Sequence, residues 1–336
     1  MKKTAIVCNS LNPDLVLYFE KKVESLGNNA IFFGNTAISS KLGIGTSSFS
    51  QTPRLSIWLA VDFFLSFYVM AQLLFKNVQC VVFDTAHISN VPLAVLCKFF
   101  RIKLVFTIHD WNPHEGVQSK AVSLYNAVVK KYLGDEFVVF SPIEFYKPMH
   151  HLTLAGFDFK GGEDKGDYFL FFGRIEPYKG LKHIVTLAHI LISNGHKERI
   201  VVAGRGDDPA LAELNKLSNV DVINRFISDE EVGRLIGGCI ATILPYDSAT
   251  QSGVVILSYS YGKPVIAFNV GELGNYIEDD VSGYLVQHNM HSEFVRKMML
   301  VKNNYDHFSK SVSEYFGRFN SESLVHQYNE LLRKLN

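Results

Sequence analysis

The feature that most constrains the fold is the alternation of short apolar runs with helical segments across residues 168–286. The run at 168–172, Tyr-Phe-Leu-Phe-Phe, is followed by a turn that begins with Gly173 and by a helical pattern from Leu181. Similar runs follow at 200–206, 220–227, 241–246, 263–268 and 283–286. Short buried strands that alternate with helices predict a parallel, doubly wound α/β sheet. Ligands of such sheets bind at the carboxyl ends of the strands, so we expect the loops after these runs to form one site.

The turn at 173–180 supplies two cations to this predicted site. Arg174 can contact a phosphate through its planar guanidinium, and Lys179 adds a compact charge five residues later. We therefore predict that the two side chains bind the two phosphates of a diphosphate. A pair of solvated loop cations is the alternative interpretation of the same residues. A helix predicted to begin near Ser252 and Gly253 would add backbone N–H donors, which favour anions.

The motifs of the second half carry a family resemblance. In chain order they are Gly-Arg-x4-Lys-Gly at 173–180, Val-Ala-Gly-x-Gly at 202–206, Leu-Pro-Tyr at 244–246, Ser-Gly-Val at 252–254, Tyr-Gly-Lys-Pro-Val-Ile-Ala at 261–267, Gly-Glu-Leu at 271–273 and Asp-Asp-x-Ser-Gly-Tyr-Leu-Val at 279–286. Together they resemble the donor-binding half of retaining family 4 glycosyltransferases. The resemblance covers the second half closely and the first half loosely.

The resemblance implies both a fold and an activity. The fold is α/β of the GT-B type, in which two Rossmann-like domains face each other across a cleft. The activity is that of a hexosyl- or related glycosyltransferase. Such an enzyme moves a sugar from a nucleoside-diphosphate sugar to a hydroxyl of a glycan or lipid-linked glycan, and UDP and GDP are the first candidates for the nucleotide. The anomeric configuration is retained, and neither a cofactor nor a metal ion takes part. Bacterial-type surface polysaccharide or glycan assembly is the implied setting.

The resemblance also assigns residues to the donor site. Arg174 and Lys179 would stabilise the charge that develops on the leaving phosphate. The backbone of 225–227 would hold the base, and we interpret Phe226 as a core residue rather than a stacking platform. Glu272 would accept a hydrogen bond from a sugar hydroxyl. The full set of expected donor contacts is Gly173, Arg174, Lys179, Gly204, Arg225, Phe226, Ile227, Gln251, Ser252, Gly253, Val254 and Glu272.

One departure from the family pattern concerns two glutamates. Most members carry them seven residues apart around the Ser-Gly-Val motif, one near the sugar and one on the ribose. Here residues 249–252 read Ala-Thr-Gln-Ser and residues 257–259 read Leu-Ser-Tyr, so both glutamates are missing. Gln251 and Ser252 can donate and accept hydrogen bonds, and we assign them to the sugar or phosphate.

The first half predicts a second Rossmann-like sheet, with strands at 1–8, 30–33, 78–84, 104–110 and 137–140. The strand at 104–110 delivers His109 and Asp110 to its carboxyl end. With Pro113, His114 and Gly116 behind them, they resemble the family segment whose histidine faces the transferred sugar. We therefore predict His109 as a catalytic residue, with Asp110 orienting it or binding the acceptor. Trp111 and His114 are weaker acceptor-side candidates, and a His109 that only caps its strand is the alternative.

The domain boundaries follow from composition. Residues 156–166 are rich in glycine and charge, so we predict an interdomain linker between an acceptor-side domain at 1–156 and a donor-binding domain at 167–317, with closure about Gly161 and Gly162. The tail at 318–336 has apolar residues at helical spacing, and in GT-B proteins the last helix often packs back on the first domain.

Composition excludes several other classes. The net charge is zero, which argues against a nucleic-acid partner. The four cysteines are widely spaced and indicate a reduced, cytoplasmic protein without zinc. The acid pairs at 207–208 and 279–280 are typical of solvated loops rather than of metal sites. The apolar segment 57–75 predicts a buried or amphipathic helix, with a membrane span as the alternative.

Peripheral contact with the inner face of the cell membrane is a further expectation. Together, the cations and apolar side chains of residues 98–103 and the aromatic side chains of residues 58–75 combine the two kinds of group that interfacial segments carry. Two other functions fit the same sequence: a sugar-nucleotide 2-epimerase, and a non-catalytic partner of an active glycosyltransferase. The missing glutamates favour the partner, whereas Arg174, Lys179 and His109 favour the enzyme.

Overall fold

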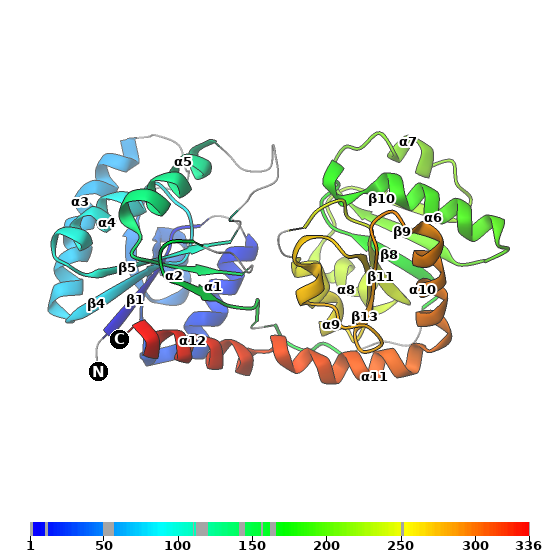
Figure 1. Ribbon diagram of the computed structural model, residues 1–336. Helices are drawn as coiled ribbons and strands as arrows, with labels where there is room; N and C mark the ends of the chain where they lie inside the picture. Colours follow the sequence, from blue (N-terminus) through cyan, green and yellow to red (C-terminus); the bar gives the residue numbers. More distant parts are fainter. Residues whose placement is uncertain are drawn as a thin grey trace. The chain divides into compact units, whose positions relative to one another are not determined.

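The computed structural model describes residues 3–10, 13–49, 57–109, 111, 120–140, 145–155, 157–161, 166–249 and 252–335 (Figure 1). Contacts divide the chain into two compact units. The first is Met1–Gly156 with Ser321–Asn336, and the second is Phe157–Asn320.

The first unit is built on a seven-stranded sheet with the order β3-β2-β1-β4-β5-β6-β7, and its paired strands are parallel. The strands are β1 (Lys3–Cys8), β2 (Ile31–Asn35), β3 (Gly45–Ser48), β4 (Val78–Phe83), β5 (Lys103–Ile108), β6 (Glu136–Val139) and β7 (Met149–His151). The helices are α1 (Pro13–Leu26), α2 (Thr36–Leu42), α3 (Ile57–Phe75), α4 (Asn90–Phe99), α5 (Lys120–Val128), a π-helical turn (Val129–Leu133) and α12 (Ser321–Leu335).

Both faces of this sheet are buried. Alternate strand residues such as Val81 and Val82 belong to separate apolar clusters, because successive side chains point to opposite faces. The last helix, α12, closes one of these clusters with Leu324, Tyr328 and Leu331, and it packs against α1. The C-terminal helix is therefore part of the first unit.

The second unit holds a six-stranded parallel sheet with the order β10-β9-β8-β11-β12-β13. Its strands are β8 (Tyr168–Phe172), β9 (Arg199–Gly204), β10 (Val220–Asn224), β11 (Ala241–Leu244), β12 (Val265–Phe268) and β13 (Gly283–Val286). Its helices are α6 (Leu181–Ser193), α7 (Leu211–Leu214), α8 (Asp229–Gly237), α9 (Gly253–Ser260), α10 (His291–Asn303) and α11 (Tyr305–Tyr315).

The two parallel sheets confirm the predicted α/β class, although β3 and β7 were not predicted. Residues 157–160, expected in the linker, are docked on the second unit: Phe157 bridges Asn320, and the Lys160 amide donates to the carbonyl of Ser260 at 2.7 Å. All four cysteines are buried and free, as expected of reduced thiols.

The prediction for residues 57–75 was wrong in one respect. A helix, α3, is present, but it is neither buried nor polar on its outer face. It is long and apolar enough to cross a membrane by length and composition, and 28% of its most apolar window is buried. Ile57, Phe64 and Phe75 are 81%, 72% and 92% exposed.

Candidate functional site

The site in the second unit forms where β8 and β9 end side by side. The amide of Gly173 donates to the carbonyl of Ala203 at 3.1 Å, and the amide of Ile175 donates to the carbonyl of Arg205 at 3.0 Å. The two turns approach so closely that a Cβ on Gly204 would lie 1.8 Å from the carbonyl oxygen of Gly173. Glycine is therefore required at 204 for the backbones to meet.

Lys179 turns its ammonium back onto this glycine turn. A Cβ on Gly173 would lie 2.7 Å from Lys179 Nζ, and Nζ also lies 5.5 Å from the centre of the Tyr246 ring. Lys179 is buried, and burial lowers the pKa of its ammonium to about 8, with the positive charge of Arg174 adding to the effect and Glu176 opposing it. Among the described residues, the Lys179 ammonium has no hydrogen bond or ion pair, and a buried cation in that situation is suited to an anionic ligand.

Arg174 takes a different position from Lys179. Its guanidinium is largely exposed and donates to Glu176 Oε1 at 2.8 Å. The other carboxylate oxygen of Glu176, Oε2, is buried with no hydrogen-bond partner among the described residues. Sequence reasoning did not select Glu176, yet an unmet acceptor beside two cations suits a ligand hydroxyl.

The N-terminus of α9 lies beside the same turn. Val254 Cγ2 would be 3.8 Å from a Cβ on Gly173, and open space surrounds the Cβ position of Gly253. Ser252 is buried at the N-cap and has an extended backbone, but its side chain does not cap the helix. The first N–H groups of α9 are thus available to an anion next to Lys179. Gln251 lies outside the described residues.

The residues predicted to hold the base differ in their exposure. Ile227 is buried, whereas the guanidinium of Arg225 is exposed and bonds both carboxylate oxygens of Glu231. Phe226 is 74% exposed, so its prediction as a core residue was wrong. The run 220–227 leaves the sheet after Asn224, and the turn carries the Phe226 ring outward, where it can stack on a base.

Glu272 is held close to the loop after β11. Its amide donates to the carbonyl of Ala249 at 3.2 Å, and a Cβ on Gly271 would lie 1.7 Å from the same oxygen. Asn275 donates to the Glu272 carboxylate. The loop that contains Glu272 is therefore fixed beside the segment that leads to Ser252.

The position of the second missing glutamate is part of the core. Ser258 is buried: its hydroxyl donates to the carbonyl of Val254 at 2.8 Å and can accept from the hydroxyl of Thr242, whose Oγ1 also lies 2.8 Å away. Tyr259 is buried, and its hydroxyl bonds Ser282 and the carbonyl of Tyr276. This part of α9 contributes packing rather than a carboxylate for a ribose.

In the first unit, His109 follows β5 as predicted. Its Nε2 lies 3.2 Å from the carbonyl oxygen of Asp84, and its ring stacks on Phe140 at 5.1 Å and 16°. A bond to a carbonyl requires hydrogen on Nε2, which leaves Nδ1 as the basic nitrogen when the ring is neutral. Asp110 and His114 lie outside the described residues. Trp111 packs edge-on against Phe137.

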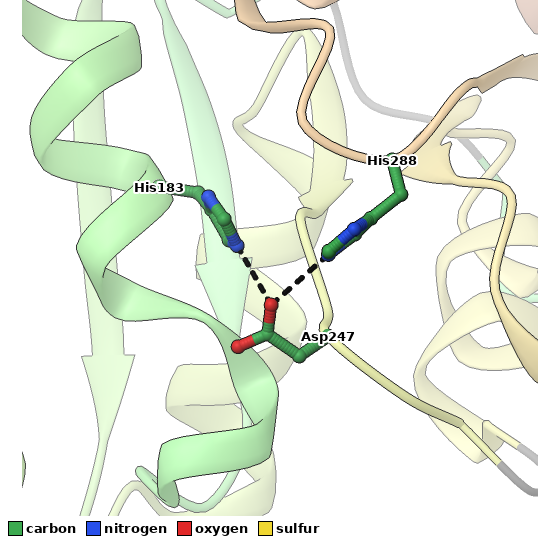
Figure 2. Close-up of side chains that lie close together, drawn as sticks. All are labelled: His183, Asp247 and His288. Atoms are coloured by element: carbon green, nitrogen blue, oxygen red, sulfur yellow. Dashed lines mark hydrogen bonds and ion pairs between the residues drawn. The ribbon is translucent and has the colours of Figure 1, made fainter.

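A cluster that the sequence did not predict joins α6 to the loops after β11 and β13 (Figure 2). Asp247 Oδ1 accepts hydrogen bonds from His183 Nε2 at 2.9 Å and from His288 Nε2 at 3.0 Å. His183 Nδ1 lies 2.9 Å from His291 Nε2, and Lys182 pairs with the other oxygen of Asp247 at 2.9 Å. Asp247 lies 64 positions from His183 and 41 positions from His288 in the sequence. Only the fold could therefore reveal the cluster.

His183, Asp247 and His288 are also the one group among the described residues whose spacing could admit a metal ion. Tetrahedral zinc bonds of about 2.0–2.1 Å would hold two ligand atoms about 3.3 Å apart. The observed separations of 2.9 and 3.0 Å are those of hydrogen bonds. The geometry therefore favours a hydrogen-bonded cluster that ties α6 to the loops after β11 and β13.

Acids of the pairs at 207–208 and 279–280 make hydrogen bonds to residues nearby in the chain. Asp208 accepts from the amide of Ala210 at 2.9 Å and Asp279 from the amide of Leu285 at 2.8 Å, while the Tyr284 hydroxyl bonds Asp280.

Comparisons with known proteins agree with this geometry. Residues 157–316 match the family model described as "Glycosyl transferases group 1". No curated protein matches the sequence. Among solved structures, Anabaena HepE in complex with UDP is 14% identical, has a TM-score of 0.70, and is matched over 99% of this chain and 100% of that one.

Two other structures are similar over the whole chain. Sucrose-phosphate synthase from Thermosynechococcus elongatus is 15% identical with a TM-score of 0.68. The lipopolysaccharide outer core galactosyltransferase WaaB is 14% identical with a TM-score of 0.69. Both matches cover 99% of each chain. This chain therefore has the GT-B fold, and nearly all of its second unit matches the model of the group 1 glycosyl transferases.

Proposed function

We propose that the protein is a retaining, metal-independent glycosyltransferase of the family 4 type, which transfers a hexose or related sugar from a UDP- or GDP-sugar to a hydroxyl acceptor. Assembly of a surface polysaccharide or another glycan is the proposed setting, and the cytoplasm is the proposed location. The second unit binds the donor.

The observation that carries this proposal is the convergence of three anion-binding features at one turn. Lys179 Nζ lies against Gly173, Val254 at the start of α9 lies against the same glycine, and Arg174 follows it in sequence. Each charge-assisted hydrogen bond contributes about 1.5–3 kcal/mol. Three to five such bonds account for the roughly 8 kcal/mol of micromolar donor binding. UDP in HepE and UDP-glucose in a second HepE complex support a nucleotide ligand for this fold.

The proposed reaction breaks the bond between the anomeric carbon and the diphosphate oxygen and forms a bond to the acceptor oxygen on the same face. The acceptor proton passes to the departing phosphate oxygen, so the step needs no further reactant. Lys179, Arg174 and the N–H groups of α9 stabilise the negative charge that grows on the leaving group. His109 is proposed to act on the transferred sugar, where its basic Nδ1 can accept from a hydroxyl.

The test is a thermal-shift series with UDP, GDP, CDP and dTDP, with and without magnesium. A nucleotide at 100 times its dissociation constant should stabilise the protein by about 2.7 kcal/mol. Lys179→Ala and Arg174→Ala should weaken binding about ten-fold or more. Arg199→Ala is the matched control, because Arg199 is an exposed arginine of the same unit that pairs with Asp167 and Asp221.

Turnover is then measured from free nucleotide and from the sugar product. His109→Ala should keep nucleotide binding and lower turnover. Release of an altered sugar without any acceptor would identify a 2-epimerase instead. If no nucleotide stabilises the wild type, the donor site fails and the non-catalytic partner becomes the better explanation.

A further inference from the structure

The outer side of α3 and α4 is an apolar surface without exposed acids. α3 and α4 lie side by side on the first unit (Figure 1). We define the apolar face as the exposed large side chains Phe64, Phe67, Tyr68 and Phe75 of α3 together with Phe99 and Phe100 at the end of α4. Phe75 and Phe99 are 92% and 79% exposed. Rings at this exposure contribute little to the stability of the unit itself.

The one acid of α3 points away from this face. Asp62 is fully buried, and its carboxylate accepts from Ser48 Oγ at 2.8 Å, Ser89 Oγ at 2.6 Å and the amide of Phe49 at 2.6 Å. In residues 57–108 the only other acid is Asp84, which is also buried. The same segment carries four cations, Lys76, Lys98, Arg101 and Lys103.

The cations lie at the end of the apolar face. Lys76 follows α3 directly, and Leu74 and Val78, two residues before and after it in the chain, line an open groove of about 570 Å³. Leu74 and Phe100 line this groove together with Lys98, Arg101 and Lys103. Lys98 and Lys103 pair with Asp135 and Glu136. In the part of the chain that the structure describes, Lys76 and Arg101 have no ion pair, so their charges are open to an anion from outside.

The net charges of the two units also favour an anionic partner for the first unit. Residues 1–156 contain 14 Lys and Arg against 10 Asp and Glu, whereas residues 157–320 contain 17 against 21. The zero net charge of the chain thus conceals a basic first unit and an acidic second unit. A protein partner would require a matching apolar and acidic surface, while an anionic bilayer supplies both properties at once.

We propose that the apolar face inserts into the interface of an anionic membrane, with Lys76 and Arg101 at the phosphate level. The aromatic side chains enter the boundary between headgroups and acyl chains, and the protein remains peripheral. This proposal does not depend on the donor site, because all of its residues belong to the first unit. If sugar transfer is also correct, the acceptor is presented at a lipid surface.

The test is flotation of the full chain with vesicles of phosphatidylcholine, with and without phosphatidylglycerol. Wild type should float with the anionic vesicles and lose binding at high salt. Phe64→Asp should weaken binding at least about ten-fold. Ile192→Asp is the matched control, because Ile192 is an exposed apolar residue on helix α6 of the second unit, and this variant should bind like wild type.

The basic part of the surface is tested separately. Each of Lys76→Gln and Arg101→Gln should reduce binding to anionic vesicles by about five-fold. Lys216→Gln, an exposed lysine of the second unit, should have no effect. Trp58 offers a direct probe, since it is 54% exposed on α3 and the chain has only one other tryptophan. In a Trp111→Phe background, its fluorescence should shift to the blue on vesicles and be quenched by brominated lipid.

Two results would overturn the proposal. The first is that wild type and Phe64→Asp bind vesicles equally, which includes the case in which neither binds. The other is a wild-type dimer that Phe64→Asp converts to a monomer without any vesicle binding, which would make the face a contact between two copies of the chain. An unchanged far-ultraviolet circular dichroism spectrum and an unchanged cooperative melting transition of Phe64→Asp show that the variant is folded.

Discussion

The ammonium of Lys179 rests on Gly173, so closely that a methyl group on this glycine would stand 2.7 Å from Nζ. Gly173 has a φ of 130°, which side chains rarely adopt. The glycine therefore serves two purposes, since it allows the turn after β8 and leaves room for the cation that we assign to the diphosphate.

Gly173→Ala should weaken nucleotide binding. The methyl group must displace Lys179 Nζ, and loss of one charge-assisted bond costs about 1.5–3 kcal/mol, or roughly ten-fold or more in the dissociation constant. Gly195→Ala is the control, because Gly195 also has a positive φ, 73°, but open space at its Cβ position. Calorimetric titration should show weak binding for the first variant only, and equal affinities would contradict the role of Gly173.

The pH dependence of donor binding should report on Lys179. Because its pKa is lowered to about 8, the free protein loses the ammonium proton as the pH rises above this value. Nucleotide affinity should be constant at lower pH and fall above pH 8, by at most about ten-fold per pH unit for one coupled proton. Lys179→Met should bind weakly at every pH. A wild-type affinity that is flat through this range would exclude a titrating lysine from the site.

The titration of Lys179 should affect stability in the opposite way to nucleotide affinity, because stability should rise with pH. The folded pKa of Lys179 lies below the unfolded value of 10.5, so folding becomes more favourable as the pH rises from about 8 to 10.5. In the absence of nucleotide, the difference in melting temperature between Lys179→Met and wild type should be largest below pH 8. It should shrink as the pH rises through this window.

The histidine cluster should make the second unit sensitive to acid. Burial lowers the pKa of His183 and of His291 below 6.5, so the unfolded chain takes up protons that the folded chain does not. The stabilising contribution is complete above pH 6.5 and is lost as the pH falls. Asp247, with a pKa lowered to about 2, adds a second loss below about pH 3.8.

His183→Gln should therefore flatten the fall in melting temperature between about pH 7.5 and 5. The glutamine amide can still donate to Asp247, which limits other effects. His189→Gln, at an exposed position of the same helix, should leave the slope unchanged. If His183→Gln and wild type lose stability in parallel, the acid response lies elsewhere in the chain.

The first unit contains a buried ion pair that should be costly to break. Lys22 Nζ lies 2.7 and 2.8 Å from the two carboxylate oxygens of Asp84, and both side chains are almost fully buried. Lys22→Met leaves Asp84 without its partner and should destabilise the unit by about 3–5 kcal/mol. Combining it with Asp84→Asn should recover part of this loss.

Lys21→Met provides the control for the buried pair. Lys21 pairs with Glu24 at 3.5 Å on the surface, where such a bond contributes about 0–1 kcal/mol. Chemical denaturation followed in the first-unit transition would measure both changes. Equal effects of the two lysine variants would show that burial does not set the strength of the pair.

The predicted donor residues show how far local patterns reach. Gly173, Lys179 and Gly204 lie in strand–turn–helix units, whose carboxyl ends meet in any parallel sheet, so their proximity follows from sequence order. The exposure of Phe226 does not, because an aromatic residue after an apolar run has the same local pattern whether it ends in the core or outside. Glu176 was missed for a similar reason, since an acid in a turn is usually solvated.

By itself, the sequence determined the α/β class, the alternation of strands and helices, and the loops that carry Arg174, Lys179 and Ser252, because these depend on residues close together in the chain. Tertiary structure alone decided two further features. It joined His183, Asp247 and His288 from separate elements, and it turned Asp62 inward so that the outer side of α3 is uncharged. Each depends on packing between distant segments, which no local pattern of residues records.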